Sequence, residues 1–501
     1  MVYDGTESQP RMGDVVIRGK EIVYVGADAA DRYDAGRTID ATGKIVAPGF
    51  IDPHTHPDTY TRSDDRAQRR NAPWLMQGVT TLAIGVDGSG TYEIAKERGW
   101  FEERGIGTNL APYVGFNSVR QSVLGEDARA PNAEELTRMR QLVANGMCEG
   151  AFGFSAGLFY APQSFAKTDE VVALAREAAL RGGVYDTHQR DESSYGIGLL
   201  SSTREAIDIG RQAGMPVHLA HLKALGVDVH GKAQELVAVI EAARRSGTRV
   251  TADQYPWLAS GSSLEASLLP RWSMEAGRSA MLKRFEDGPT LQRIRTEMRD
   301  NLRRRGGADS LLLTAANRPW SGKRLDEIAA QWQLDPIDAA LYIIRGADDA
   351  ADRSPGSAVA SFNMNADDVK VLMRQPWVVT SSDGSDGHPR QYATFPKKYA
   401  EYVQRDRVLS IAEFIHRSSG LTADILGLER RGYLRPGYFA DVVVIDPARY
   451  EPKADYVHPD VLSEGVVHLW VNGTLAVDTG RMTDALAGEV LSHTPLPGSC
   501  Q

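Results

Sequence analysis

Two histidines one residue apart, His54 and His56, follow an apolar run in the segment IVAPGFIDPHTHPD, residues 45–58. An apolar run that stops at polar residues is typical of a buried strand whose C-terminal end opens into a site. Side chains alternate along an extended chain, so both imidazoles are expected to point the same way. Taken alone, the pair fits two surface histidines beside a turn better than a metal site. Its chemistry therefore depends on which other ligands the chain supplies.

Four later segments also deliver a metal-type ligand at the end of an apolar run. Imidazole and carboxylate ligands suit Zn²⁺ or a related divalent ion, and a catalytic ion keeps one position open for water. Each histidine alone has a core or capping role as its alternative, but the repetition with acidic partners predicts one shared metal site. The segments are IGVDGSG with Asp87, YDTHQRDES with His188, VHLAHLKALG with His221 and TSSDGSDGHPR with Asp383.

Such a site predicts hydrolysis. A metal lowers the pKa of a bound water towards about 7, and a nearby carboxylate can take the water's proton as it attacks a carbonyl. Asp383 is the expected base as well as a ligand, because it comes last in the series and lies between a strand and a loop.

The elements that position these residues alternate between strands and helices over about 370 residues, which predicts an α/β fold with a parallel sheet. Functional residues at successive strand ends favour the closed (β/α)8 TIM-like barrel. A doubly wound open sheet is the alternative, but it would focus its site at one crevice. The expected strands include Val184–His188, Val217–His221, Arg249–Asp253 and Trp377–Thr380, and the expected helices include Thr203–Gln212 and Ala233–Arg245.

Short β elements at both chain ends predict a second, smaller unit. Asp14–Arg18 and Glu21–Gly26 flank a hairpin turn at Gly19-Lys20. Ala440–Asp446, His468–Val471 and Thr474–Asp478 form the corresponding C-terminal set. We therefore expect a small β-sandwich domain from residues 1–47 plus 428–501, and a barrel domain from residues 48–427.

Between about residues 264 and 332 the alternation fails, and the sequence is helical and rich in arginine. We expect an inserted helical lobe over the barrel mouth. Interleaved Glu and Asp favour a solvated helix face over a phosphate or nucleic-acid contact.

Composition narrows the class of protein. A formal net charge of −9 argues against nucleic acid or an anionic membrane as the main partner. No apolar run reaches membrane-spanning length, and the first residues do not form a signal peptide. The two cysteines, Cys148 and Cys500, do not predict a disulfide framework, so Cys148 is expected to be a packed thiol and the protein to be cytoplasmic.

The ordered series HTH, THQRDES, HLAHLK and SSDG resembles the amidohydrolase superfamily, and more narrowly the N-acyl-D-amino-acid deacylases, the D-aminoacylase family. The similarity covers essentially the whole chain, with further matches in GVTTLAIG, EGAFGFSAGLFYAP, DQYPW, GHPRQYATFP and RGYLRPGYFADVVVID. The HTH motif alone is weak evidence for this resemblance, whereas the ordered series of motifs is specific to the family. The resemblance implies hydrolysis of the amide of an N-acylated amino acid, with one or two zinc ions held by the histidines and a strand-end aspartate as acid and base.

The resemblance also implies a set of substrate contacts. Lys223 in HLK, Tyr255 in DQYPW and Arg390 in GHPR match residues that hold the substrate carboxylate, and Tyr160 in GLFYAP matches another pocket residue. An arginine fork and a lysine that converge on one point select a carboxylate. The alternatives are a surface lysine, a salt bridge that holds the Arg390 loop, and tyrosines that only pack.

The chain departs from the family at one ligand. Members commonly have a metal-binding cysteine in GNCG after the second barrel strand, where this chain has Gly85-Val86-Asp87-Gly88. Asp87 can supply a harder carboxylate, which would bind zinc less tightly and admit other divalent ions, or it can be a turn residue. We favour ligation. The subtype with a carboxylated lysine between two metals is not supported, because EGAFGFSAGL contains no lysine.

Alternatives on the same scaffold are dipeptide cleavage and cyclic-amide opening. A non-catalytic scaffold protein is less favoured, because all four histidines and Asp383 are present. The sequence does not fix the preference for D or L amino acids, the acyl group, the side chain, the number of metals, the completeness of the N-terminus or the oligomeric state.

Overall fold

Parallel strands form the centre of the molecule, which the computed structural model describes for residues 1–346 and 356–500. One parallel ladder runs in the order β4-β5-β6, and a second in the order β7-β8-β9-β10-β11-β15. Only Tyr113 separates β6 from β7, and Thr55, after β4, bridges in parallel to Gly384, after β15. The strand order therefore returns to its start, as the predicted barrel requires. The strands are β4 (Phe50–Asp52), β5 (Val79–Ile84), β6 (Asn109–Pro112), β7 (Val114–Gly115), β8 (Gly153–Gly157), β9 (Val184–His188), β10 (Val217–Leu219), β11 (Val250–Gln254) and β15 (Val378–Thr380).

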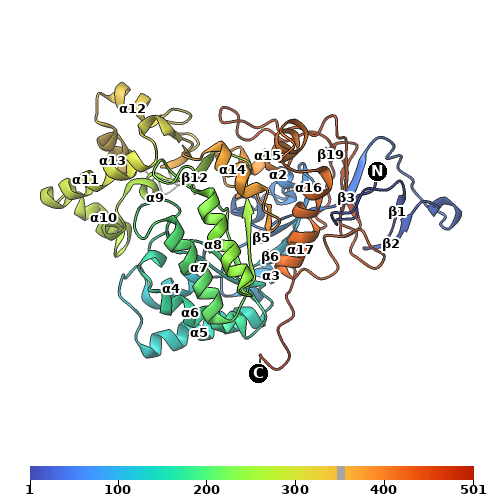
Figure 1. Ribbon diagram of the computed structural model, residues 1–501, viewed down its shortest axis with the longest axis horizontal. Coiled ribbons are helices and arrows are strands. Elements are labelled where there is room, and N and C mark those ends of the chain that lie inside the picture. Colours follow the sequence, from blue (N-terminus) through green and yellow to red (C-terminus); the bar gives the residue numbers. More distant parts are fainter. Residues whose placement is uncertain (347–355, 501) are drawn as a thin grey trace.

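Helices cover the outside of these strands, and α5, α6, α7 and α8 pack against one another in chain order (Figure 1). Their apolar residues recur at helical spacing and face the strands, as do Val171, Leu174 and Ala178 of α6. β9 and α8 have the bounds that the sequence predicts. The strand predicted at Val217–His221 ends at Leu219, because His221 adopts a φ of 35°, outside the range of a pleated strand. The helices are α3 (Ile94–Arg104), α4 (Phe116–Leu124), α5 (Ala133–Cys148), α6 (Thr168–Ala179), α7 (Leu199–Ala213), α8 (Ala233–Arg245), α14 (Ala366–Met373), α15 (Arg390–Lys397), α16 (Ile411–Ser418) and α17 (Gly420–Leu426).

The apolar run before the two histidines forms two strands in different sheets. β3 (Ile45–Pro48) pairs antiparallel with β16 (Val442–Ile445), whereas β4 pairs parallel with β5. Gly49 joins them, and a Cβ at this position would lie 2.4 Å from the side chain of Thr80. The close approach requires glycine, so the chain leaves the small sheet and enters the barrel within one residue.

Strands from both chain ends share one antiparallel sheet in the order β19-β18-β17-β16-β3. The other members are β17 (Val466–Val471), β18 (Thr474–Asp478) and β19 (Arg481–Met482). β1 (Asp14–Arg18) and β2 (Glu21–Gly26) form a separate hairpin with the predicted bounds. The domain boundaries proposed after residues 47 and 427 stay a prediction.

A helical lobe projects from the barrel mouth at the end of the molecule remote from the β1–β2 hairpin (Figure 1). It has its own apolar core, which includes Ile294, Met298 and Ile328. An antiparallel sheet in the order β12-β14-β13 connects it to the barrel. The predicted range 264–332 lies within this group, which consists of β12 (Ala259–Ser263), α9 (Leu264–Leu268), α10 (Gly277–Arg284), α11 (Gly288–Arg304), β13 (Leu311–Leu313), α12 (Leu325–Trp332), α13 (Pro336–Gly346) and β14 (Ala358–Phe362).

The C-terminal segment crosses the barrel at the ends of β6 and α5. Leu110 pairs with Val490, and His493 donates its backbone N–H to Gly150. Cys148 and Cys500 form a disulfide with Cα atoms 5.6 Å apart. The prediction that Cys148 is a free packed thiol was therefore wrong, since the sequence did not show that the tail returns to α5. With both cysteines in a disulfide, cysteine usage no longer supports a reducing cytoplasm.

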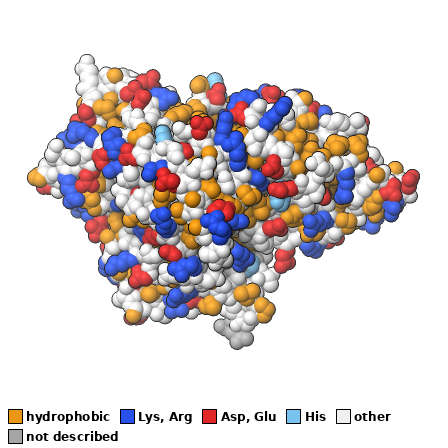
Figure 2. All heavy atoms as spheres, viewed as in Figure 1, with side chains coloured by type: hydrophobic (Ala, Val, Ile, Leu, Met, Phe, Trp, Pro, Cys, Tyr) orange, Lys and Arg blue, Asp and Glu red, His pale blue; other side chains and the backbone are white. Residues whose placement is uncertain are grey.

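The surface carries both signs of charge. On the face shown in Figure 2, Lys and Arg side chains are interspersed with Asp and Glu and with apolar groups. Among the helices of the described residues, none is both long and apolar enough to span a membrane.

A buried polar cluster joins the small sheet to the barrel. Asp441, next to β16, accepts the backbone N–H of Asn472 at 2.8 Å and the side-chain amide of Asn109, on β6, at 3.3 Å. Arg431 forms a buried ion pair with the same carboxylate. Both charges are almost entirely excluded from water, so each depends on the other for compensation.

Replacing Arg431 with Met should therefore lower the free energy of unfolding by about 3–5 kcal/mol, because the Asp441 carboxylate would stay buried without its cation. Denaturant unfolding followed by circular dichroism measures the change. The matched control is Arg211→Met, which breaks an exposed pair with Asp208 and should cost about 0–1 kcal/mol. Equal effects of the two substitutions would contradict a structural role for the buried pair.

Candidate metal and active site

Six side chains that the sequence predicts as metal ligands lie close together where the parallel strands end. His54 and His56 follow β4, Asp87 follows β5, His188 ends β9, His221 follows β10 and Asp383 follows β15.

The carboxylate of Asp87 lies between two pairs of imidazoles. Its Oδ1 is 3.5 Å from Nε2 of His54 and 3.6 Å from Nε2 of His221. Its Oδ2 is 3.5 Å from Nε2 of His56 and 3.8 Å from Nδ1 of His188. Asp87 is thus placed as a ligand would be, and its side chain faces the site rather than the turn before Gly88.

Asp383 closes the cluster on the side of His54 and His56. Its Oδ1 is 3.3 Å from Nε2 of His56 and 3.7 Å from Nε2 of His54. Nδ1 of His188 and Nε2 of His221 are 2.9 Å apart. Tetrahedral coordination at the usual Zn–N distance separates ligand atoms by roughly 3.3 Å. The donor atoms therefore have the spacing that a shared divalent cation needs.

The polar atoms at the centre lack other partners. Nδ1 and Nε2 of His54 and Oδ1 of Asp87 are buried and have no hydrogen-bond partner within the described chain. Burial disfavours a charged His56, but the carboxylates of Asp383 and Asp87 outweigh it and raise the pKa of His56 to about 10. Burial also opposes the charge of Asp87, yet the imidazoles, His54 foremost, hold the pKa of this carboxyl well below its ordinary value. The centre of the cluster thus favours positive charge, and the residues fit a metal ion.

Three of the six residues have left-handed backbone. The φ angles are 54° at Asp87, 35° at His221 and 49° at Asp383. A non-glycine residue in this region costs on the order of 1 kcal/mol or more and persists only where its surroundings impose it. This backbone conformation turns the three side chains away from their strands and towards the common centre.

Glu192 supports two of the imidazoles from outside the cluster. Its Oε1 is 3.3 Å from Nδ1 of His221, and its Oε2 is 3.6 Å from Nε2 of His188. Burial opposes its charge, but Lys223 and the two imidazoles lower the pKa of Glu192 to about 2. A carboxylate that faces the far nitrogen of a histidine fixes its tautomer and orientation for metal binding. Glu192 is not among the residues predicted from the sequence, although it lies four residues after His188 in the motif THQRDES.

Asp253 holds two residues in place in the layer of side chains directly below the cluster. Its Oδ1 accepts the backbone N–H of His221 at 2.9 Å, and its Oδ2 lies 3.0 Å from Nε2 of His218. His218 is fully buried and its Nδ1 lies 2.9 Å from Thr251 Oγ1. His218 therefore belongs to the core below the cluster.

The predicted base is paired with a predicted substrate contact. Nη1 of Arg390 lies 2.7 Å from Oδ2 of Asp383. Burial opposes the charge of Asp383, but Arg390 and His221 hold the pKa of the carboxyl far below its usual value. The other guanidinium nitrogen, Nη2, donates to Ser385 at 3.2 Å.

The remaining predicted contacts lie around the same centre. Nζ of Lys223 is 2.7 Å from Oε1 of Glu192 and 5.7 Å from the ring centre of Tyr255. The guanidinium of Arg390 lies 5.1 Å from the same ring centre, so both cations lie beside one phenol ring. The ring of Tyr160 lies 4.8 Å from that of His188. Burial raises the pKa of both phenols well above the ordinary value, so both stay neutral hydrogen-bonding groups.

These residues open into a cavity of about 800 Å³, large enough for a small organic substrate. Segments of the helical lobe and of β12 line it beside the barrel loops. Among the lining residues are His56, Asp87, Tyr160, His188, Glu192, His221, Lys223, Tyr255, Arg305, Asp383 and Arg390.

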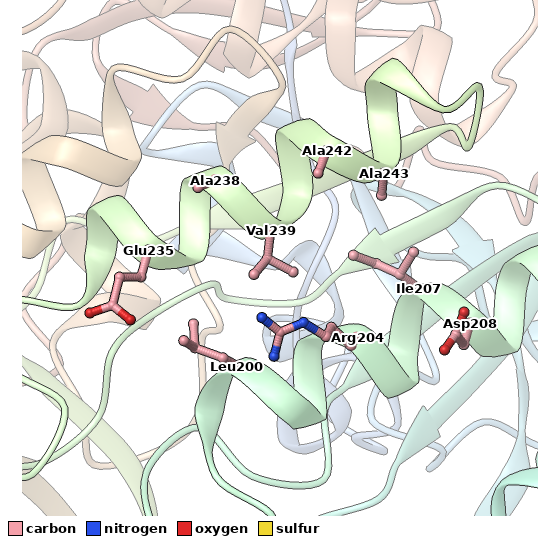
Figure 3. Close-up of a pocket in the computed structure, with 9 residues that line it drawn as sticks. All are labelled: Leu200, Arg204, Ile207, Asp208, Glu235, Ala238, Val239, Ala242 and Ala243. Carbon is pink, nitrogen blue, oxygen red and sulfur yellow. The ribbon is translucent and has the colours of Figure 1, made fainter.

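A second hollow lies on the outside of the barrel, between α7 and α8 (Figure 3). Its volume is about 560 Å³. Leu200, Ile207 and Val239 supply its apolar lining, and Arg204 lies between the two helices. It contains no pair of groups arranged for acid–base or metal chemistry among its lining residues, so the strand-end cavity is the candidate active site.

Comparison with known proteins agrees with this geometry. An amidohydrolase family model matches residues 37–294 and 323–477. D-aminoacylase of Alcaligenes xylosoxydans xylosoxydans is 30% identical over 98% of this chain and 96% of its own length, and a crystal structure of D-aminoacylase superimposes with a TM-score of 0.82 over 98% of both chains. N-acyl-D-aspartate deacylase of the same organism is 31% identical over 98% of this chain and 93% of its own.

The N-acyl-D-glutamate deacylase of Bordetella bronchiseptica, solved with zinc and a phosphonate mimic of the tetrahedral intermediate, superimposes with a TM-score of 0.80 at 27% identity over 98% of both chains. The fold, the site and the full-length similarity thus agree with one another. The chain belongs to the amidohydrolase family and, within it, to the group of D-aminoacylases and N-acyl-D-amino-acid deacylases.

Proposed function

We propose that this protein is a metal-dependent hydrolase that cleaves the amide bond of N-acyl-D-amino acids and releases the free amino acid and a carboxylate. The observation that carries the proposal is the convergence of four imidazoles and two carboxylates at one point of the cavity. Relatives that cover nearly the whole chain are a D-aminoacylase and an N-acyl-D-aspartate deacylase, which supports this substrate class. The ring order of the parallel strands supports a closed eightfold barrel as the scaffold.

Two overlapping groups of candidate ligands support a site that holds one or two cations. One group is His54, His56 and Asp87, and the other is Asp87, His188 and His221. Asp87 is common to both, and each of its oxygens faces one imidazole of each group. We assign zinc as the ion, since imidazole and carboxylate are its usual ligands and a relative binds it. With a carboxylate at position 87, the site should also accept harder divalent ions.

A cation in this position would polarise the scissile carbonyl and lower the pKa of the attacking water. Asp383 accepts the proton of that water and passes it to the departing amine. Arg390 keeps Asp383 ionised and oriented, because its Nη1 holds the second carboxylate oxygen at 2.7 Å. Glu192 and Asp253 keep His188 and His221 in position during turnover.

The substrate's α-carboxylate binds between Lys223, Tyr255 and Arg390. Both cations lie beside one phenol ring, which gives a fork and a point charge for a single carboxylate. Nζ of Lys223 also lies 2.7 Å from Nδ1 of His221. When Nε2 of His221 binds a cation, its Nδ1 carries the hydrogen and donates to Glu192, which leaves one ammonium hydrogen of Lys223 for the substrate. Tyr160 offers its phenol beside His188, next to the reacting amide.

Replacing Asp383 with Ala should lower kcat for an N-acetyl-D-amino acid by about 10²–10⁴-fold, because the general base is lost. Metal content, measured by atomic emission, should stay largely unchanged, since the imidazoles and Asp87 are intact. Asp386→Asn, on the same loop and at the cavity edge, is the control and should keep its activity. Wild-type turnover by the Asp383→Ala protein would exclude the assigned role.

Replacing Asp87 with Asn should weaken zinc binding to the apoprotein by roughly tenfold to a hundredfold, because the charged ligand shared by both groups is removed. Asp87→Cys should instead raise the preference for zinc over manganese, since a thiolate is a softer ligand. Competition with a chromophoric chelator measures both. Asp58→Asn, which changes an exposed carboxylate at the cavity rim, should leave affinity as in the wild type. Unaltered zinc affinity in Asp87→Asn would show that Asp87 is only a turn residue.

A further inference from the structure

Arg390 has two tasks in the proposed reaction, and its own side-chain contacts are few. It holds Asp383 at 2.7 Å and lines the cavity beside Tyr255. Its guanidinium also donates to Ser385 at 3.2 Å, but its Nε has no hydrogen-bond partner among the described residues. A long side chain needs further support from its backbone and from the surface on which it packs. Both kinds of support come from one segment, residues 255–261.

The packing surface is a glycine of β12. A Cβ at Gly261 would lie 2.7 Å from Nη2 of Arg390 and 3.0 Å from its Cζ. The guanidinium therefore packs directly against the backbone of Gly261. Any larger residue at this position would displace it from Asp383, since the side chain is only 2% exposed and has little room to move elsewhere.

His388 connects the backbone of Arg390 to the same strand. Its Nδ1 accepts the backbone N–H of Arg390 at 3.1 Å, and its Nε2 lies 3.2 Å from the carbonyl oxygen of Ala259. A neutral imidazole has one acceptor and one donor nitrogen, so both are used here, with the hydrogen on Nε2. Burial and the positive charge of Arg390 hold the pKa of His388 well below its ordinary value, which agrees with a neutral ring.

Aromatic residues fix the orientation of the His388 ring. The ring of Trp257 lies edge-on at 5.9 Å and that of Tyr456 at 5.2 Å. Trp257 also donates its Nε1–H to Thr394 at 2.9 Å, and the hydroxyl of Thr394 donates to the carbonyl of Arg390 at 2.7 Å. Both backbone polar groups of Arg390 are thus tied, through one intermediate side chain each, to the segment that begins with Tyr255.

His388 has no direct access to the reaction. It is 2% exposed and is not one of the residues that line the cavity. Any effect of this imidazole on turnover must therefore pass through the residues that it holds. Two roles fit its contacts. It can order only the turn before α15, through Nδ1, or it can also fasten this turn to β12, through Nε2.

We propose that His388 is a positioning residue that fastens the backbone of Arg390 to β12 and so directs the guanidinium onto Asp383. This inference rests on the proposed function. β12 serves as the template, because its Ala259 carbonyl holds the imidazole and its Gly261 leaves space for the guanidinium. The contact through Nε2 is the one that distinguishes this role from a local turn.

The test separates the two nitrogens of His388. A glutamine amide can reach the position of Nε2 and donate to Ala259, whereas an asparagine amide reaches only the position of Nδ1 and accepts from Arg390. We expect His388→Asn to lower kcat for an N-acetyl-D-amino acid by roughly tenfold to a hundredfold, and His388→Gln to keep kcat within about threefold. His458→Asn, at an exposed histidine, is the control and should keep its activity. Equal losses in His388→Asn and His388→Gln, or a larger loss in His388→Gln, would overturn the proposal.

A double-mutant cycle tests whether the effect passes through Arg390. In an Arg390→Ala background, His388→Asn should lower the remaining kcat by no more than about twofold, because the side chain that it positions is gone. The full loss in this background would show that His388 acts elsewhere. Gly261→Ala, which leaves His388 intact, should reduce kcat as His388→Asn does, since the new methyl group displaces the guanidinium. Wild-type turnover by Gly261→Ala would contradict the template.

Hydrogen exchange gives a measurement that does not depend on activity. If the wild-type protein hydrolyses no N-acyl amino acid, the proposed function fails, and the exchange of backbone amides in residues 384–395 decides the positioning role separately. Exchange in this segment should be faster in His388→Asn than in the wild type and in His388→Gln, because the turn is no longer fastened to β12. Equal exchange in the two variants would overturn the proposal.

Discussion

The structure depends on positive charge at one point in the barrel mouth, where the lone pairs of imidazoles and carboxylates meet. Four imidazoles and two carboxylates face one another there, with donor atoms 2.9 Å apart for His188 and His221 and 3.3 Å apart for His56 and Asp383. Without positive charge between them, such groups repel. Left-handed backbone at Asp87, His221 and Asp383 holds three of them in this arrangement against local strain, and the surrounding barrel must supply the energy.

Charge around this point is arranged in layers. The imidazoles and Asp87 form the centre, Glu192 and Asp253 hold the imidazoles from outside, and Lys223 and Arg390 balance the outer carboxylates. Asp87 lies at the centre of these layers, between the two groups of histidines. A thiolate offers one sulfur atom to two metals, whereas a carboxylate offers two oxygens, and the oxygens of Asp87 each face both groups of histidines. The substitution of the family's usual cysteine is therefore compatible with a binuclear centre of harder character.

Most of the candidate site could be predicted from the sequence, because its imidazoles, carboxylates and strands have local signals. An apolar run that ends in histidine or aspartate indicates each candidate ligand. Helical spacing indicates α8, and the turn residues Gly19-Lys20 indicate the hairpin of β1 and β2. The sequence did not show that the run before His54 belongs to two sheets, since the change depends on the packing of Gly49 against Thr80. It did not show the Cys148–Cys500 disulfide for the same reason, because contacts between distant segments leave no periodic pattern. Glu192 could have been predicted as a partner of His188, because it lies four residues after this histidine in the sequence.

The most direct measurement of the central claim is anomalous X-ray diffraction at the zinc absorption edge, from crystals of protein purified with zinc. We expect one or two anomalous peaks among His54, His56, Asp87, His188 and His221, with occupancy that falls in His221→Ala. Crystals with bound zinc elsewhere, or with no peak among these residues, would contradict this expectation and leave the strained cluster without an explanation.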